Sequence, residues 1–169
     1  MNIFLACGEP SGDLYAGALT RELRALDKSV NVYGLGGDHM RQAGAEVVED
    51  FSGLTVTGVS EALAVIPRSL VMYRRLVALA RDERPDVFVP IDFPEINFRL
   101  AGSMRKMGIP VVYYVCPQVW AWRRGRLGKI KKFSTKALVI FPFEEAIYRE
   151  AGIPVEFVGH PLVDLTDTE

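Results

Sequence analysis

The residue of this chain with the clearest potential for acid–base chemistry is Asp92. It follows a mostly apolar run, residues 86–91, that is typical of a buried strand. A carboxylate at the tip of such a strand is costly unless water solvates it or a ligand uses it. Asp92 could accept the proton of a sugar hydroxyl as a general base, with Glu95 and Asn97 orienting it. The alternative is that these polar residues only cap the next helix.

A second polar segment, residues 8–13, joins a predicted strand to a helix N-terminus. Glycines there let a ligand approach the backbone, and free N–H groups with the helix dipole favour an anion. The segment has neither the dinucleotide pattern GxGxxG nor a Walker lysine, and Glu9 would repel a phosphate, so sugar hydroxyls fit it better. A tight turn with Ser11 as the helix N-cap is the alternative. The residues expected to touch a substrate are Gly8, Glu9, Ser11, Gly12 and Asp13.

Cations and tryptophans gather in a third segment, residues 117–132. Trp120 and Trp122 precede six basic residues that no acidic residue interrupts: Arg123, Arg124, Arg126, Lys129, Lys131 and Lys132. Indoles beside cations suit a membrane interface or a phosphorylated lipid, and they also suit stacking on nucleic acid. The plainer interpretation is a solvated basic helix face with the tryptophans in the core.

The two histidines and two cysteines of the chain give no sign of a metal site. Cys7 and Cys116 lie far apart, and with only two histidines the chain has no metal-ligand spacing. His160, between Gly159 and Pro161, is interpreted as structural. Unpaired cysteines and the absence of a signal-like N-terminus lead us to expect a reduced, cytoplasmic protein.

Short apolar runs alternate with helical patterns along the chain. Strands are predicted at 2–7, 30–35, 46–48, 86–91, 110–115, 136–140 and 155–158. Helices are predicted from Ser11 with Leu19, Leu23 and Leu26 on one face, over 59–66, from Pro67 with Leu70 and Ala80 on one face, and over 95–107, 120–133 and 142–151. This alternation predicts an α/β fold, a doubly wound, mostly parallel and Rossmann-like sheet. Ligands bind such sheets outside the carboxyl ends of the strands, where the polar segments above fall.

Composition limits the classes of function. The chain has 169 residues, of which 49% are hydrophobic and 24% charged, so one globular domain is expected. The net charge of −1 argues against a broad nucleic-acid surface, so any basic site must be local. No run of about 18 apolar residues occurs. The nearest approach, residues 53–71, carries only Glu61 and Arg68 as charges.

Taken together, several motifs resemble those of the lipid-A-disaccharide synthase family. They occur in order over essentially the whole chain, and the most specific are Gly-Glu-Pro-Ser-Gly-Asp and Trp-Ala-Trp-Arg. The motifs stand at 8–13, 36–40, 58–61, 91–97, 117–123, 141–144 and 159–162.

The resemblance implies an inverting glycosyltransferase of the GT-B fold that needs no metal or cofactor. Such an enzyme joins UDP-2,3-diacylglucosamine to 2,3-diacylglucosamine 1-phosphate, on the cytoplasmic face of the inner membrane of a Gram-negative bacterium. Asp92 matches the family's catalytic base, whereas Glu95 replaces a second aspartate. Beside the 8–13 loop, the expected substrate contacts are Glu61, Asn97, Trp120, Trp122 and Arg123, and the expected membrane or phosphate contacts are Arg124, Arg126, Lys129, Lys131 and Lys132.

The resemblance also implies a second domain. A GT-B enzyme has two Rossmann-like domains, and the nucleotide is held mostly by the C-terminal one. We therefore expect residues 1–163 to form the acceptor-side domain and 164–169 to begin a linker or tail. The C-terminal domain would then lie outside this chain, which would be one domain of a longer protein, a truncated or split gene product completed by a second chain, or a stand-alone half with another role. The alternative is a non-catalytic lipid- or phosphate-binding module that needs a partner chain.

Overall fold

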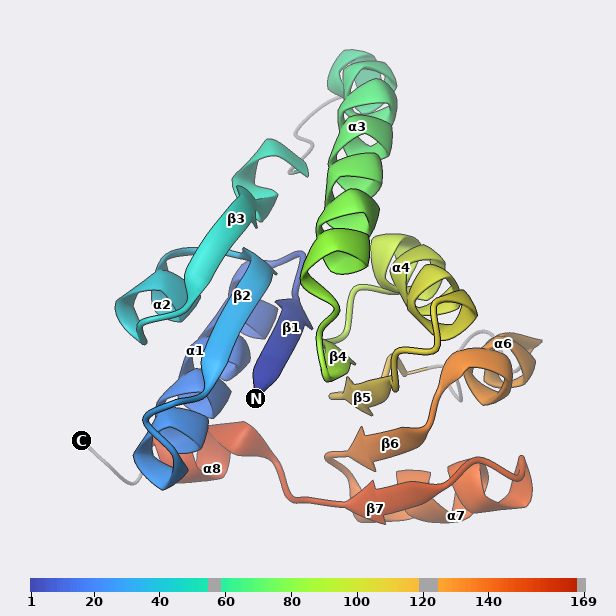
Figure 1. Ribbon diagram of the computed structural model, residues 1–169. Helices are drawn as coiled ribbons and strands as arrows, with labels where there is room; N and C mark the ends of the chain where they lie inside the picture. The colour runs from blue at the N-terminus through green and yellow to red at the C-terminus, as the bar shows by residue number, and fades with distance from the viewer. Residues whose placement is uncertain (55–58, 119–124, 167–169) are drawn as a thin grey trace.

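Strands and helices alternate along the chain, as the sequence predicts (Figure 1). The computed structural model describes residues 1–54, 59–118 and 125–166, without the side chains of 53–65 and 166. The strands are β1 (Asn2–Ala6), β2 (Asn31–Gly36), β3 (Glu46–Asp50), β4 (Val87–Pro90), β5 (Val112–Tyr114), β6 (Lys136–Val139) and β7 (Val155–Phe157). The helices are α1 (Pro10–Leu26), α2 (Asp38–Gln42), the 3-10 turn η1 (Phe51–Leu54), α3 (Val59–Glu83), α4 (Pro94–Lys106), α6 (Gly125–Phe133), α7 (Pro142–Glu150) and α8 (Pro161–Thr166).

The described strands are all parallel and form two hydrogen-bonded groups. One group has the order β3-β2-β1-β4 and the other the order β5-β6-β7. Two isolated bridges, Phe88 with Val111 and Ile91 with Tyr114, join β4 to β5. The strand order therefore runs 3-2-1-4-5-6-7. Successive strands are added on one side from β1 to β3 and on the other side from β4 to β7. This is the doubly wound arrangement that was predicted, with its switch point between β1 and β4.

The core has one half on each face of the sheet, because alternate residues of β1 point to opposite faces. Phe4 packs with α3, α4 and α6 on one face, where its ring stacks on Tyr33 with centroids 5.4 Å apart. Ile3 and Leu5 pack with α1 on the other face. Both faces of β1 are therefore buried, which explains its continuous apolar sequence.

Two of the predicted helices differ from those in the structure. The helix predicted from Pro67 does not begin there, because α3 runs through Pro67 as a single helix of 25 residues. Its buried face contains Met72, Leu76 and Ala80, whereas Leu70 of the predicted stripe is 40% exposed. In α1, Leu19 and Leu23 of the predicted stripe pack partly buried against the core, whereas Leu26 is 87% exposed. The helix also buries small residues such as Gly12 and Ala16 against the sheet.

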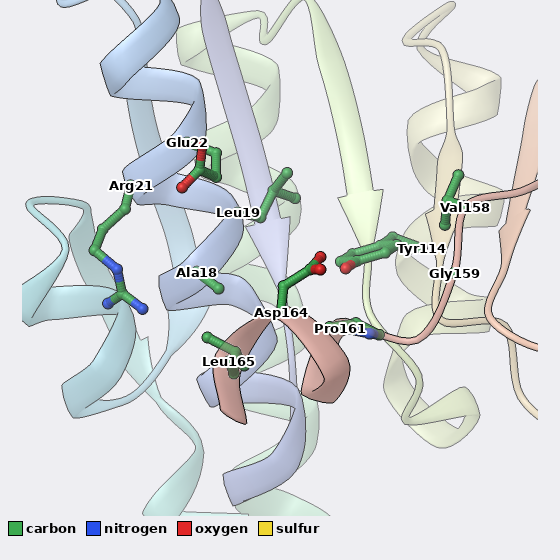
Figure 2. A pocket seen from close by; sticks show the side chains of 10 residues that line it. All are labelled: Ala18, Leu19, Arg21, Glu22, Tyr114, Val158, Gly159, Pro161, Asp164 and Leu165. Carbon is green, nitrogen blue, oxygen red and sulfur yellow. The ribbon is translucent and has the colours of Figure 1, made fainter. Parts of the chain in front are cut away.

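Two neighbouring cavities lie on the side of the sheet beside α1. An apolar cavity of about 430 Å³ lies there, and its lining includes Leu23, Val87, Val112 and Leu138. Beside it, α8 lies next to α1, and Tyr114, Asp164 and Leu165 line a cavity of about 550 Å³ (Figure 2). Residues 164–166, assigned above to a linker or tail, form the end of α8. No helix in the described part of the chain is both long and apolar enough to cross a bilayer.

Candidate active site at the carboxyl edge of the sheet

The loops that follow β1 and β4 bring two carboxyl side chains together at the switch point. Glu9 stands after β1 and Asp92 after β4, and the two strands are neighbours in the sheet. When Asp92 is protonated, a hydrogen bond joins its side chain to that of Glu9. Ser11 Oγ donates a second hydrogen bond, of 2.9 Å, to Glu9 Oε1 and so restrains that carboxylate. The structure thus contains a Ser11–Glu9–Asp92 chain of polar groups at the sheet edge.

The environment of Asp92 favours its protonated form. Burial has the largest effect and, together with the neighbouring charge and hydrogen bond of Glu9, raises the pKa of Asp92 from 3.8 to about 6. A hydrogen bond from the backbone of Phe93 acts in the opposite direction. A carboxyl group with such a pKa is ionised at neutral pH, yet it is a stronger base than an ordinary aspartate.

The backbone holds Asp92 in an unusual conformation. Asp92 and the next residue, Phe93, have φ values of 42° and 46°, in the left-handed region that most side chains avoid. The N–H of Asp92 donates to the Val115 carbonyl at 3.1 Å. The carbonyl of Asp92 accepts from Tyr113 Oη and from Asn97 Nδ2, each at 2.8 Å. These contacts offset the backbone strain and fix the direction of the carboxyl group.

Asn97 acts on the backbone and not on the Asp92 carboxylate. Its side chain is fully buried, and Nδ2 also lies 3.1 Å from the Ala6 carbonyl and 3.2 Å from the Ile91 carbonyl. One amide group therefore ties together the ends of β1 and β4, and we call this group of contacts the Asn97 clasp. Neither Glu95 nor Asn97 caps α4, whose N-cap is Phe93 without a side-chain hydrogen bond.

Gly12 and Asp13 have structural contacts. A Cβ on Gly12 would lie 3.0 Å from Cys7 Cβ, so this glycine allows α1 to pack closely on β1. The Asp13 carboxylate is buried and accepts backbone N–H groups at the start of α2, 2.8 Å from Gly37 N and 2.9 Å from His39 N. Both residues therefore position α1 and α2 beside the site, and their substrate contact stays a prediction. The alternative that Ser11 caps α1 is wrong, because the helix begins at Pro10 with Glu9 as its N-cap.

The basic segment is only partly described. Arg126 lies 3.8 Å from Glu95 and 5.8 Å from the centroid of the Phe98 ring, so it already has partners on α4. Lys129 and Lys132 lie on the side of α6 that faces α4, and Lys131 extends toward Gly152. Trp120, Trp122, Arg123 and Arg124, together with the side chain of Glu61, are outside the described residues.

Two tyrosines at this edge are absent from the sequence prediction. Tyr113 supports the Asp92 carbonyl, as described above. Burial raises the pKa of Tyr15, and the charges of Asp92 and Glu9 act in the same direction. The His160 ring lies 6.2 Å from that of Tyr15 and 5.5 Å from that of Phe141, and these three rings form an aromatic cluster. Tyr15 lies four residues, about one helical turn, after Ser11 of the predicted loop, and that spacing is the signal that could have identified it.

Replacement of Glu9 by Gln is expected to lower the pKa of Asp92. The change removes a like charge and supplies an amide that can donate to the Asp92 carboxylate, although the effect of burial remains. Titration of the Asp92 carboxyl carbon by NMR measures this pKa directly in the isolated chain. Glu95→Gln is the matched control with a smaller expected shift, because Glu95 has the weakest of the effects on Asp92. A pKa unaffected by Glu9→Gln would contradict the pairing.

Gly8→Ala is expected to destabilise the site. A Cβ on Gly8 would lie 2.0 Å from Phe93 Cδ1, so the ring beside Asp92 must move. Overpacking of this kind lowers the free energy of unfolding by about 1–3 kcal/mol, measurable by urea titration. Gly128→Ala in α6 is the control: a Cβ there meets nothing within 4 Å, and the change should stabilise the helix by about 0.5–1 kcal/mol. Equal effects of the two substitutions would contradict the close contact.

Comparison with known proteins gives consistent matches. A sequence model of lipid-A-disaccharide synthetase matches residues 3–169. The lipid-A-disaccharide synthase of Koribacter versatilis is 46% identical over 169 residues, and that of Geobacter metallireducens is 43% identical over 162. These alignments cover 99% and 96% of this chain, but 44% and 42% of the relatives. The chain thus spans about two fifths of the length of these curated relatives.

Solved structures match the fold at low identity. A UDP-GlcNAc 2-epimerase from Neisseria meningitidis, bound to UDP-GlcNAc, aligns with a TM-score of 0.72 and 13% identity over 97% of this chain and 47% of that one. MurG from Acinetobacter baumannii aligns with a TM-score of 0.55 and 13% identity over 84% and 41%. These matches show the fold alone, a Rossmann-like half of the GT-B type.

Proposed function

Because the chain belongs to the lipid-A-disaccharide synthetase family, we propose that it is the acceptor-side half of a lipid-A-disaccharide synthase. In this proposal residues 1–163 bind 2,3-diacylglucosamine 1-phosphate, and a C-terminal part holds UDP-2,3-diacylglucosamine. The single observation that carries it is the Glu9–Asp92 carboxyl pair at the switch point of the sheet. Ligands of doubly wound folds bind at such edges.

The chemistry follows from the position of the Asp92 carboxyl group. Asp92 takes the proton of the acceptor hydroxyl as that oxygen attacks the anomeric carbon of the donor sugar. The bond between the anomeric carbon and the UDP oxygen breaks, and UDP leaves with the electron pair. Attack from the face opposite the leaving group inverts the anomeric centre. With a pKa of about 6, Asp92 is still ionised at neutral pH and can act as the base.

A reconstitution assay tests this proposal. The chain is supplied with UDP-diacylglucosamine and the acceptor, either alone or together with the C-terminal part of the Koribacter versatilis relative. A parallel chimera replaces the matching segment of that relative with this chain. Disaccharide formation in the completed proteins, and not in the chain alone, is the expected result. Acceptor binding without turnover in any completed protein would favour a non-catalytic lipid-binding module.

We further propose that the domain is peripheral on the cytoplasmic face of the inner membrane. Apolar side chains on α3 support this, because Ile66, Leu70 and Val71 are 63%, 40% and 48% exposed. Residues 53–65, which precede these side chains in the sequence, carry Glu61 as their only charge. Cations in the 123–132 segment would attract anionic lipid. Co-sedimentation with phosphatidylglycerol vesicles is expected, with weaker binding as salt increases. No co-sedimentation with either neutral or anionic vesicles would refute the membrane contact for this chain.

A further inference from the structure

A groove with a strong excess of positive charge runs between α4 and α6, which lie side by side (Figure 1). Its volume is about 440 Å³. Three cations come from α4, namely Arg99, Arg105 and Lys106, and two come from α6, namely Lys129 and Lys132. No acidic residue lines this groove among the residues that the structure describes. Only the α6 cations belong to the basic run predicted from the sequence, because the α4 cations are interspersed with apolar residues.

The five cations lack protein partners within the described part of the chain. None of them takes part in an ion pair there, in contrast with the neighbouring Arg126, which lies 3.8 Å from Glu95. Like charges held in one groove repel one another, and a bound anion relieves that repulsion. Because the whole chain has a net charge of −1, this concentration of positive charge is local and not a general property of the surface.

The floor of the groove is apolar and partly open. Phe133 is 5% exposed and forms part of the core, and Phe98 packs against it with ring centroids 5.3 Å apart. Gly102 also lines the groove, and a Cβ there would meet no atom within 4 Å. An alkyl group therefore has room to lie along the floor. A nucleic-acid base fits less well, because Phe133 is almost fully buried and only Phe98, which is partly covered by Arg126, Tyr113 and Phe133, is left for stacking.

We propose that the α4–α6 groove binds the phosphate group of an anionic lipid, with the first methylenes of the lipid over Phe98 and Gly102. The cations neutralise the phosphate, and the apolar floor distinguishes a lipid headgroup from free phosphate. This site is separate from the carboxyl pair, because Arg105 and Lys106 lie at the opposite end of α4 from Asp92. The inference deepens the membrane contact proposed above and rests on it, since it names the lipid group that the domain recognises.

Soluble lipids test the groove without vesicles. The isolated chain is titrated with dihexanoyl phosphatidylglycerol below its micelle concentration, and amide shifts in α4 and α6 are followed by NMR. The parallel probes are dihexanoyl phosphatidylcholine and inorganic phosphate. We expect saturable shifts with phosphatidylglycerol and at least about ten-fold weaker binding of the other two probes. Equal binding of phosphatidylcholine, or equally tight binding of inorganic phosphate, would overturn the assignment to an anionic lipid. Tighter binding of a single-stranded oligonucleotide to the same amides would overturn it as well.

Variants separate the charge of the groove from its shape. Arg105→Gln/Lys129→Gln/Lys132→Gln should weaken phosphatidylglycerol binding at least about ten-fold, whereas Lys28→Gln/Arg74→Gln/Arg81→Gln, which removes three exposed cations elsewhere, should not change it. Gly102→Leu fills the floor without changing any charge, and it should weaken binding of the lipid but not of phosphate. Thermal unfolding verifies that each variant is folded. Equal losses in the two triple variants would overturn the proposal. Vesicle binding retained through α3, without lipid shifts in the groove, would refute the groove and leave the membrane contact standing.

Discussion

Asp92→Asn is expected to lower kcat of the completed enzyme by about 10²–10⁴-fold, the usual contribution of a general base. Asparagine has nearly the same shape and tolerates the left-handed conformation that Asp92 adopts, with φ of 42°. The backbone contacts of Asp92 with Val115, Tyr113 and Asn97 should persist, so the change removes only the carboxylate. Turnover is measured in the chimera with the Koribacter versatilis relative, with Asp82→Asn on the exposed end of α3 as the control.

The pH dependence gives this prediction a second readout. Because Asp92 must be ionised to accept a proton, kcat of the unsubstituted enzyme should rise with pH and level off above about 6. Asp92→Asn should abolish that limb of the profile. The folded-state pKa is raised above 3.8, so the contribution of Asp92 to stability falls as pH rises from about 4 to 6. The variant should therefore be more stable, relative to the unsubstituted chain, at pH 7 than at pH 3. Near-normal turnover in a folded variant would exclude Asp92 as the base.

Asn97→Asp is expected to be the most destabilising of the substitutions considered. It replaces a buried amide that faces three carbonyl groups with a carboxyl group of equal size. An ionised carboxylate there would be repelled by those oxygens, and the carbonyls would lose their donor. We expect the free energy of unfolding at pH 7 to fall by about 3–5 kcal/mol, and less at pH 4 where protonation restores one donor.

Urea unfolding followed by circular dichroism measures this loss. Asn31→Asp makes the same chemical change at an exposed position of β2 and should alter the free energy of unfolding by less than about 0.5 kcal/mol. A loss below about 1 kcal/mol in Asn97→Asp would mean that the clasp contributes little to the fold.

The sheet could be predicted from sequence for a physical reason. Strands buried on both faces are apolar throughout, and the order of helices and strands leaves few parallel arrangements. The same rule predicts that Glu9 and Asp92 lie at one edge of the sheet. Their hydrogen bond, and the pKa that it helps to raise, depend on side-chain positions that no sequence pattern specifies.

Helix faces and local roles were less predictable. The buried residues of α1 are mostly small, because close packing on the sheet requires them. Of the predicted leucine stripe, Leu19 and Leu23 pack partly buried against the core, whereas Leu26 is exposed. Asp13 is a similar case: from sequence it resembles a first-turn acidic residue, but it accepts N–H groups from residues 24 to 27 positions away. Contacts of this length arise from tertiary packing. Local propensity therefore gives no signal for them.

The Asn97 clasp also sets the order in which the site can be assembled. Its partners are Ala6, Ile91 and Asp92, and the Asp92 backbone is further held by Tyr113 and Val115, so every direct contact falls within residues 6–115. Closing the loop between Ala6 and Asn97 costs chain entropy, and nothing local repays it before β1, β4 and α4 have docked. We therefore expect the left-handed turn at Asp92 to form late in folding. Amide exchange at Asp92 should follow unfolding of the whole sheet and not local fraying.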